Sequence, residues 1–303
     1  MRTVKMRATA AKKQPAGLPG ADANAHKKNL LIEALSYIGR FEDKIVVIKY
    51  GGAVMVREEV KRSFSQDVVL LRSLGMRPVI VHGGGPEVSK AMHEMGHEPR
   101  FVEGLRVTTA EGLRITEMVL SGTINKDITA RLNTAGGSGV GLSGKDAGLI
   151  MARKMDSLNG VDLGFVGEIT HINPSILNLL LENGYIPVIS PLGMGEDGTT
   201  YNINADTAAS RIAGALAAEK LIFMTDVEGV LRAGKLVSAM SVDEAGRLIS
   251  EGVIDGGMIP KVEAILHGLA HGVASAAIIC GNDHHAIIAE LFTDKGIGTI
   301  FTA

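Results

Sequence analysis

The sequence predicts an α/β protein in which helices pack on a mostly parallel central sheet. Short apolar runs alternate with segments of helical periodicity, as expected when helices connect parallel strands. The apolar runs are continuous rather than alternating, which is typical of strands buried on both faces. The chain has 303 residues, of which 46% are hydrophobic and only 4% aromatic. These values predict a large core built mainly from aliphatic side chains.

The first ordered element is predicted near residue 29. Residues 1–28 are basic, with Asp22 as their single acidic side chain, and they contain no serine. Organelle transit peptides are usually rich in serine, so we interpret this segment as a disordered basic tail. In residues 29–41, Leu30, Leu31, Leu35 and Ile38 form one apolar stripe of a helix.

The remaining elements follow in alternation. The predicted strands cover residues 45–49, 78–82, 139–143, 186–190, 221–225 and 276–280. The predicted helices cover residues 57–74, 86–95, 110–133, 173–183, 205–218, 241–251 and 258–271. The stretch 193–202 is rich in glycine and polar residues, and it predicts a hinge between two lobes.

Composition excludes several classes of protein. The net charge of −2 does not favour binding to nucleic acid or to a membrane surface. No apolar run reaches the roughly 18 residues that a membrane span requires. Cys280 is the single cysteine, so no intramolecular disulfide can form, and a reducing cytoplasm is the expected compartment.

Three motif matches fail their structural tests. "HEMGH" at 93–97 fits a zinc-protease helix, but Gly96 and Pro99 predict that the helix ends before His97. "GVGLSG" at 139–144 fits a dinucleotide fingerprint, but its residues are themselves the predicted strand. The overlapping near-match to a Walker loop has Asp146 where a hydroxyl must bind Mg²⁺.

Glycine-rich turns follow two of the predicted strands. Lys49 ends the first strand and precedes Gly51 and Gly52, whose backbone N–H groups an anion could approach closely. Taken alone, this pattern fits a surface lysine equally well. His82 ends the second strand before "GGGPEV", where a helix N-terminus offers another anion site. His82 is either a base or, more commonly at a strand end, a structural histidine.

Further polar residues occur at later strand ends. Arg106 in "EGLRVT" could clamp a carboxylate or lie on the surface. In "YNINADTAA", Asn202, Asn204 and Asp206 alternate, so they share one side of an extended segment. Asp206 could instead be a helix N-cap. Lys261 follows a glycine pair at the start of a late helix. With no protein-kinase signature present, this set predicts phosphoryl transfer by positioning and charge stabilisation.

At these residues the chain resembles the amino-acid kinase superfamily, and within it the kinases of N-acetyl-L-glutamate. The resemblance extends from about Leu31 to Thr299. It rests on the motifs "VVIKYGGAVM", "VIVHGGGPEV", "FVEGLRVT", "EMVLSGTINK", "VGLSGKDAGLI", "NINADTAA", "MTDVEGVL" and "GGMIPKV". It implies a three-layer αβα sandwich preceded by an N-terminal helix. It also implies a substrate lobe over residues 29–198 and an ATP lobe over 199–303.

The resemblance also implies roles for individual residues. It assigns catalysis to Lys49, Lys261 and Asp206, substrate binding to Gly84, Gly85, Arg106, Asn202 and Asn204, and ATP binding to Gly51, Gly52, Asp226, Gly229, Leu231, Val253, Asp255 and Lys261. The implied reaction is phosphorylation of the γ-carboxylate of N-acetyl-L-glutamate by ATP with Mg²⁺, giving N-acetyl-L-glutamyl 5-phosphate in arginine biosynthesis. A carboxylate with a pKa of about 4.3 is already ionised at neutral pH, so no catalytic base is needed.

Two alternatives stay open. The chain could phosphorylate a related acidic amino acid, such as glutamate or an aminoadipate derivative, or it could be a non-catalytic amino-acid-binding subunit. The N-terminal helix and the tail "HHAIIAELFTDKGIGT" resemble the arginine-inhibited, hexameric members, which are trimers of dimers. That resemblance places Tyr37, Glu290 and Gly296 at an L-arginine site. Ala277 and Asn282 stand where those members have histidine and arginine.

Overall fold

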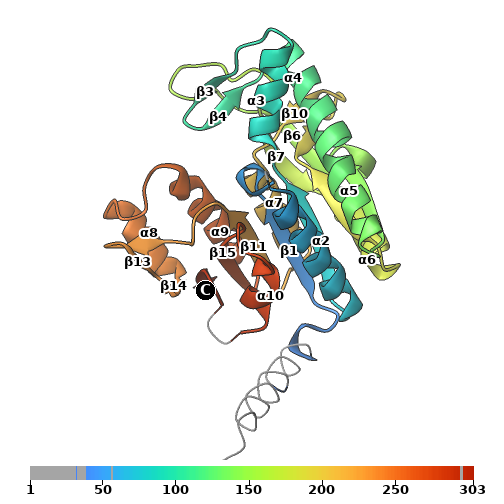
Figure 1. The fold of residues 1–303 in the computed structure, drawn as a ribbon. Helices are drawn as coiled ribbons and strands as arrows, with labels where there is room; N and C mark the ends of the chain where they lie inside the picture. Colours follow the sequence, from blue (N-terminus) through green and yellow to red (C-terminus); the bar gives the residue numbers. More distant parts are fainter. Residues whose placement is uncertain (1–31, 33–38, 56, 294–295) are drawn as a thin grey trace, which may run out of the picture.

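The computed structural model describes residues 32, 39–55, 57–293 and 296–303 (Figure 1). Its centre is an eight-stranded sheet in the order β14-β16-β15-β11-β1-β2-β8-β5. These strands are β1 (Ile45–Tyr50), β2 (Arg77–His82), β5 (Gly139–Ser143), β8 (Ile186–Ser190), β11 (Lys220–Thr225), β14 (Ala239–Ser241), β15 (Ser275–Cys280) and β16 (Thr299–Thr302). Every neighbouring pair is parallel except β15 and β16. The predicted mostly parallel sheet is therefore confirmed.

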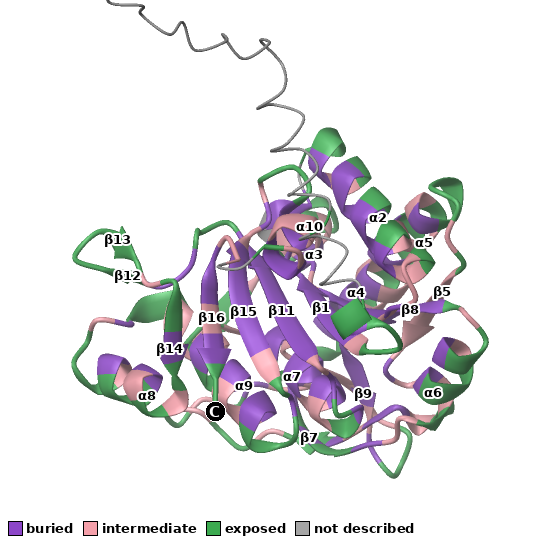
Figure 2. Ribbon diagram, turned by 90° about the horizontal axis from the view of Figure 1, so that it is seen from below, coloured by how far each residue is buried: buried purple, intermediate pink, exposed green. Residues whose placement is uncertain are grey.

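Helices cover both faces of this sheet, and successive strand residues point to opposite cores. Val47 belongs to one core cluster with residues of helices α6 (Ser175–Glu182), α7 (Ala205–Ala215), α8 (Val242–Ser250) and α9 (Ile259–Ala270). Val46 and Ile48 belong to a second cluster, with residues of α2 (Glu58–Ser73), α3 (Gly85–Glu94), α4 (Ala110–Glu117), α5 (Asn125–Thr134) and α10 (Ala286–Leu291). Figure 2 shows β15, β11 and β1 as largely buried strands. Burial on both faces explains the continuous apolar runs.

Smaller sheets complete the fold. Strands β6 (Ile150–Lys154), β7 (Gly167–Ile172), β9 (Leu192–Met194) and β10 (Thr200–Asn202) form a four-stranded sheet. Two hairpins consist of β3 (Arg100–Val102) with β4 (Leu105–Val107), and of β12 (Leu231–Arg232) with β13 (Lys235–Leu236). The stretch 193–202, predicted as a hinge, thus contains parts of two paired strands, with Tyr201 opposite Gly193.

The predicted helix 110–133 is one continuous helical segment with a π-helical section in the middle. The helices α4 and α5 flank the π-helix η2 (Met118–Ile124). At the start of α5, Asn125 is fully buried, and its Nδ2 donates to the carbonyl oxygens of Val188 at 2.9 Å and Leu142 at 3.2 Å. This amide therefore ties the helix to strands β5 and β8. A close approach here requires Gly141, because an added Cβ would collide with Asn125 Oδ1.

The remaining sequence-based predictions concern single segments of the chain. The tail 1–28 and most of the predicted helix 29–41 lie outside the described residues, although 39–41 are helical. Helix α3 ends at Glu94, which confirms that His97 lies beyond it. Within the described ranges, no set of three or more metal-ligating side chains converges. In the same part of the chain, no helix is both long and apolar enough to cross a bilayer.

Candidate active site

Two lysines from distant parts of the chain meet at one aspartate. Lys49 lies near the end of β1, and its Nζ is 2.8 Å from Asp206 Oδ1. Lys261, in the first turn of α9, donates from Nζ to Asp206 Oδ2 at 2.9 Å. Lys49 and Asp206 are 8% and 6% exposed. The sequence-based prediction that these residues lie together agrees with this geometry, and the trio carries one surplus positive charge.

The aspartate is held by a neighbouring cap rather than acting as a cap itself. Asn204 precedes α7, and its Oδ1 accepts from the backbone N–H groups of Asp206 at 2.8 Å and Thr207 at 3.0 Å. An N-cap satisfies the free donors of the first helical turn. The alternative reading of Asp206 as the N-cap is therefore wrong. Because Asn204 serves the backbone, the Asp206 carboxylate is available to both lysines.

Burial and charge compete in setting the protonation of this trio. Burial alone would raise the pKa of Asp206, but Lys49 and Lys261 outweigh it, so the net pKa is lowered. Burial also lowers the pKa of Lys49, which Asp206 offsets only in part and Lys261 reinforces. Asp206 is accordingly an anion at neutral pH, and it favours the charged form of Lys49.

The two glycine-rich turns lie directly against each other. The N–H of Gly83 donates to the carbonyl oxygen of Tyr50 at 2.9 Å. A Cβ added at Gly52 would lie 3.0 Å from Pro86 Cδ, and one added at Gly84 would overlap Ile124 Cδ1. Gly84 also has a φ of 153°, which favours glycine. The turns after β1 and β2 therefore form one backbone surface beside Lys49.

Arg106 is part of this site and is not a surface residue. It lies on β4, is 8% exposed, and donates from Nη2 to the Gly85 carbonyl at 2.9 Å and to Ser89 Oγ at 2.8 Å. Its Cζ is 4.6 Å from the centroid of the Phe101 ring. Burial lowers the pKa of Arg106. These contacts hold the guanidinium at the start of α3.

A cavity of about 230 Å³ joins these groups. Its lining includes the predicted residues Lys49, Gly52, Gly84, Gly85, Arg106, Asn202, Asn204 and Asp206. Asn202 is fixed by donating from Nδ2 to Thr108 Oγ1 at 3.2 Å. The apolar wall contributed by Leu120 and Val166 was not predicted, because isolated apolar residues carry no sequence signal for a ligand site. Leu120 does fall within the quoted motif "EMVLSGTINK".

Of the predicted nucleotide residues, Gly52 lines this cavity, and the others lie outside its lining. Asp226 follows β11 and accepts from Thr225 Oγ1 at 3.1 Å. Gly229 packs so closely on Thr299 that a Cβ would lie 2.5 Å from its Oγ1. Leu231, Val253 and Asp255 complete the set, in segments after β11 and before α9. Lys261 follows the last of these segments in the sequence, in the first turn of α9, and donates to Asp206. Gly51, in the turn after β1, lies near Lys49, since a Cβ there would be 3.4 Å from Nζ.

His82 and Glu290 are both engaged by neighbouring groups. The ring of His82 is fully buried, with Nδ1 2.8 Å from the Gly83 carbonyl and Nε2 3.3 Å from Asn125 Nδ2. Burial lowers its pKa to about 4, which fits a neutral structural histidine. Glu290 Oε1 is 2.7 Å from Lys220 Nζ, and a Cβ at Gly296 would collide with the Glu290 carboxylate. Tyr37 lies outside the described residues.

Fold and site together define a phosphotransferase in which lysines and glycine turns replace a Walker loop. The model of the amino acid kinase family matches residues 44–280. Acetylglutamate kinase from Desulforamulus reducens is 51% identical over 90% of this chain and 96% of its own length. Its counterpart from Methanococcus aeolicus is 50% identical over 92% of this chain and 99% of its own. The chain belongs to the amino acid kinase family, within its acetylglutamate kinase branch.

Solved structures share the fold. N-acetylglutamate synthase from Neisseria gonorrhoeae, complexed with coenzyme A and N-acetyl-glutamate, has a TM-score of 0.82 and 27% identity. The match covers 91% of this chain and 63% of the synthase chain, so this chain spans less than two thirds of that protein. Carbamate kinase from Giardia has a TM-score of 0.60 at 17% identity, with 86% of this chain and 99% of that chain covered. The second likeness shows the fold alone.

Proposed function

We propose that this protein transfers the γ-phosphoryl group of ATP to the γ-carboxylate of N-acetyl-L-glutamate. The product is N-acetyl-L-glutamyl 5-phosphate, an intermediate of arginine biosynthesis. The observation that carries the proposal is the pairing of Lys49 and Lys261 with one buried Asp206 at the edge of a cavity that also holds Arg106. Acetylglutamate kinases at about 50% identity over nearly their whole length support the choice of substrate.

In this proposal the substrate lies in the cavity with its two carboxylates at opposite ends. Arg106 and the Gly84–Gly85 backbone bind the α-carboxylate, which suits a bidentate guanidinium. Asn202 and Asn204 line the same cavity and are proposed to bind substrate polar groups. The γ-carboxylate then points towards Lys49. It is ionised at neutral pH, so it attacks without a general base. This is consistent with the buried, neutral state of His82.

Phosphoryl transfer needs compensation of negative charge more than it needs proton transfer. The two lysines supply fixed positive charge where a carboxylate and phosphoryl oxygens come together. Asp206 holds both ammonium groups in place. Backbone N–H groups at Gly51 and Gly52 add donors that carry no reorganisation cost. We propose that Asp226, Gly229, Leu231, Val253 and Asp255 border the nucleotide.

Magnesium is proposed to enter with ATP, bound through the nucleotide's phosphates. Asp206 is already occupied by two lysines, and no cluster of three metal-ligating side chains occurs in the described ranges. This donor set fits a cation that keeps water and phosphate ligands rather than one held in an all-protein cage. When bound, Mg²⁺ would neutralise charge on the transferring phosphate.

We also propose that L-arginine inhibits the enzyme, that Tyr37, Glu290 and Gly296 lie at its site, and that the protein is a homo-oligomer of dimers, most simply a hexamer. The Lys220–Glu290 pair is almost fully buried, at 8% and 0% side-chain exposure. An arginine guanidinium that reaches Glu290 must therefore share this carboxylate with Lys220. We propose that the protein is located in the cytoplasm, because a chain with a single cysteine suits a reducing compartment.

One assay separates the proposed function from its alternatives. ATP consumption is measured in the presence of N-acetyl-L-glutamate, L-glutamate, L-aspartate or N-acetyl-L-aminoadipate, each at the same concentration. We expect N-acetyl-L-glutamate to give the highest kcat/KM. A preference for another acid would assign the chain to a related kinase. Binding of N-acetyl-L-glutamate without phosphoryl transfer would assign it to a regulatory subunit.

A further inference from the structure

A second cavity, of about 280 Å³, lies on the α2–α5 face of the central sheet. It shares no lining residue with the substrate cavity among the described residues. Its apolar walls include Phe64 from α2 and Ile128 from α5, and the Tyr50 ring stacks on Phe64 at 3.9 Å between centroids. Aromatic and aliphatic walls with a few polar groups are typical of small-molecule sites.

Two enclosed polar atoms that line this cavity have no hydrogen-bond partner among the described residues. They are the hydroxyl of Tyr50 and Oε2 of Glu87. Tyr50 is only 2% exposed. Buried polar groups in native proteins nearly always find a partner, and an unpaired one is costly. A hydroxyl and a carboxylate oxygen left unpaired in one cavity therefore indicate a ligand that supplies hydrogen-bond donors.

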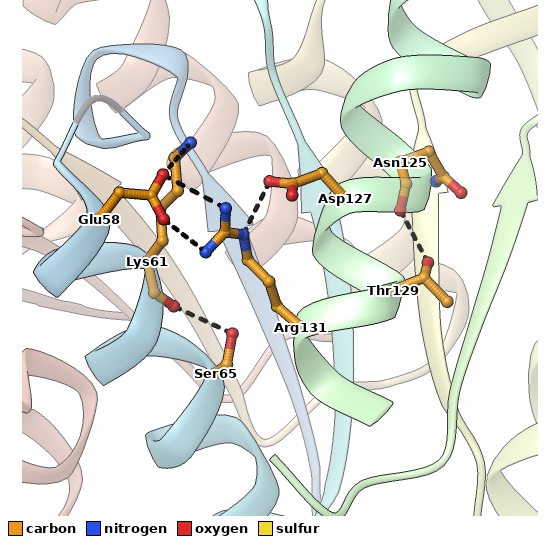
Figure 3. A network of polar contacts seen from close by, with 7 residues as sticks. All are labelled: Glu58, Lys61, Ser65, Asn125, Asp127, Thr129 and Arg131. Atoms are coloured by element: carbon orange, nitrogen blue, oxygen red, sulfur yellow. Dashed lines mark hydrogen bonds and ion pairs between the residues drawn. The ribbon is translucent and has the colours of Figure 1, made fainter. Parts of the chain in front are cut away.

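The charged side chains around the cavity indicate the sign of the charge that the ligand carries. Arg131 donates from Nε to Asp127 Oδ2 at 2.8 Å and from Nη1 to Glu58 Oε2 at 2.8 Å. Lys61 Nζ is 3.1 Å from Glu58 Oε1. Figure 3 shows these side chains converging from α2 and α5. The cavity lining holds the carboxylates of Asp127 and Glu87 and the cations Lys61 and Arg131. Arg131 is paired with Asp127, and Lys61 with Glu58 outside the lining, so the lining carboxylate without a described partner is Glu87.

We propose that this cavity is a second ligand site, which binds a small compound carrying an ammonium group on an apolar body. The ammonium group donates to Glu87 Oε2 and to the Tyr50 hydroxyl, and the apolar part packs on Phe64 and Ile128. Charge-assisted hydrogen bonds of this kind are the strong ones in partly buried sites. The site adjoins the glycine-rich turn after β2, since Ile124 lines it and also lies against Gly84.

The test uses three probes of one shape and different charge. Benzylamine, benzyl alcohol and benzoate are titrated against the full chain by ligand-observed NMR at pH 7. A ligand of this size is expected to bind with a Kd on the order of 1 mM. We expect benzylamine to bind at least about tenfold more tightly than the other two, because they lack the charged donor. Equal binding of benzyl alcohol, tighter binding of benzoate, or no binding of benzylamine would overturn the proposal.

Variants locate the bound probe. Glu87→Gln keeps the shape of the side chain and removes its charge, and we expect it to weaken benzylamine binding about tenfold. The matched control is Glu94→Gln on the exposed side of the same helix α3, which should leave the Kd unchanged. Equal effects of the two variants, or none of Glu87→Gln, would overturn the assignment. Phosphoryl transfer plays no part in these measurements, so their failure is distinct from failure of the proposed function.

Discussion

At the scale of single residues, Asp206 accounts for the geometry of the site. Its two carboxylate oxygens hold one ammonium group each, at 2.8 Å for Lys49 and 2.9 Å for Lys261. Burying such a network costs desolvation free energy that its internal attractions only partly return. The cost is consistent with a functional role, because a desolvated positive charge interacts strongly with an incoming phosphoryl group.

The first prediction concerns the two lysines. Lys49→Ala and Lys261→Ala are each expected to lower kcat roughly 10²–10³-fold, as for loss of one preorganised donor to a transition state. Binding of N-acetyl-L-glutamate, measured by calorimetry, should change far less. The control is Lys90→Ala on the exposed side of α3, whose side chain is 78% exposed. Turnover near the wild-type value in either lysine variant would exclude that residue from catalysis.

The second prediction separates Asn204 from its neighbour Asp206. Asn204→Ala removes the N-cap of α7 and should lower the free energy of unfolding by about 1 kcal/mol. Asp206→Asn keeps that cap and should instead lower kcat, because it releases both lysines. Chemical denaturation and steady-state kinetics measure the two effects. Ser241→Ala, which removes the N-cap of α8, is the control for a cap lost far from the site. If Asn204→Ala leaves stability unchanged, the capping role is refuted.

At the scale of elements, the sequence predicted the six buried parallel strands and most helices. It missed β14, β16, α10 and every strand of the smaller sheets, including the five-residue β6 and the six-residue β7. Continuous apolar runs mark β1 and β11 because both faces of these strands are covered. Strand β14 has three residues and β12 two, which is too short for a periodic signal. The sequence also left open whether Asn204 or Asp206 caps α7, because both residue types are common N-caps. The structure shows that Asn204 is the cap.

Asn125 joins three elements, and it gives the third prediction. Gly141→Ala would bring a Cβ within 2.0 Å of Asn125 Oδ1 and 2.8 Å of Thr129 Oγ1. We expect a loss of about 1–3 kcal/mol in the free energy of unfolding, typical of overpacking. Gly246→Ala in α8 is the matched control, because an added Cβ there meets nothing within 4 Å. That variant should be neutral or stabilising by up to about 1 kcal/mol. Similar losses in both variants would contradict the close packing of Gly141 on Asn125.

At the scale of the whole molecule, the two predicted lobes contribute to one continuous sheet. Strand β1, before the predicted boundary at 198, pairs in parallel with β11 after it, from Val46 opposite Lys220 to Tyr50 opposite Met224. Lys49 and Lys261 thus approach Asp206 from opposite sides of that boundary. The division into a substrate lobe and an ATP lobe stays a prediction. Two lobes that move relative to each other would let the protein close over both substrates, as many kinases do.

The last prediction concerns assembly and feedback. The apolar stripe predicted in residues 29–41 needs a partner, and a second dimer would provide one. We expect light scattering to give a hexameric mass for the full chain and a dimeric mass after removal of residues 1–38. This truncation keeps Phe41, which is buried in the core. Arginine titration of the full chain should lower kinase activity, and Glu290→Gln should weaken that inhibition.

Lys220 provides the control for this experiment, because Glu290→Gln also disrupts the buried pair with Lys220. Lys220→Met removes the same pair but keeps the carboxylate that would bind the guanidinium. If both variants lose arginine sensitivity equally, the pair acts through stability, and direct binding at Glu290 is refuted. A dimeric mass for both the full chain and the truncated chain would refute the proposed assembly. Kinase activity that does not change with arginine concentration would refute the proposed feedback.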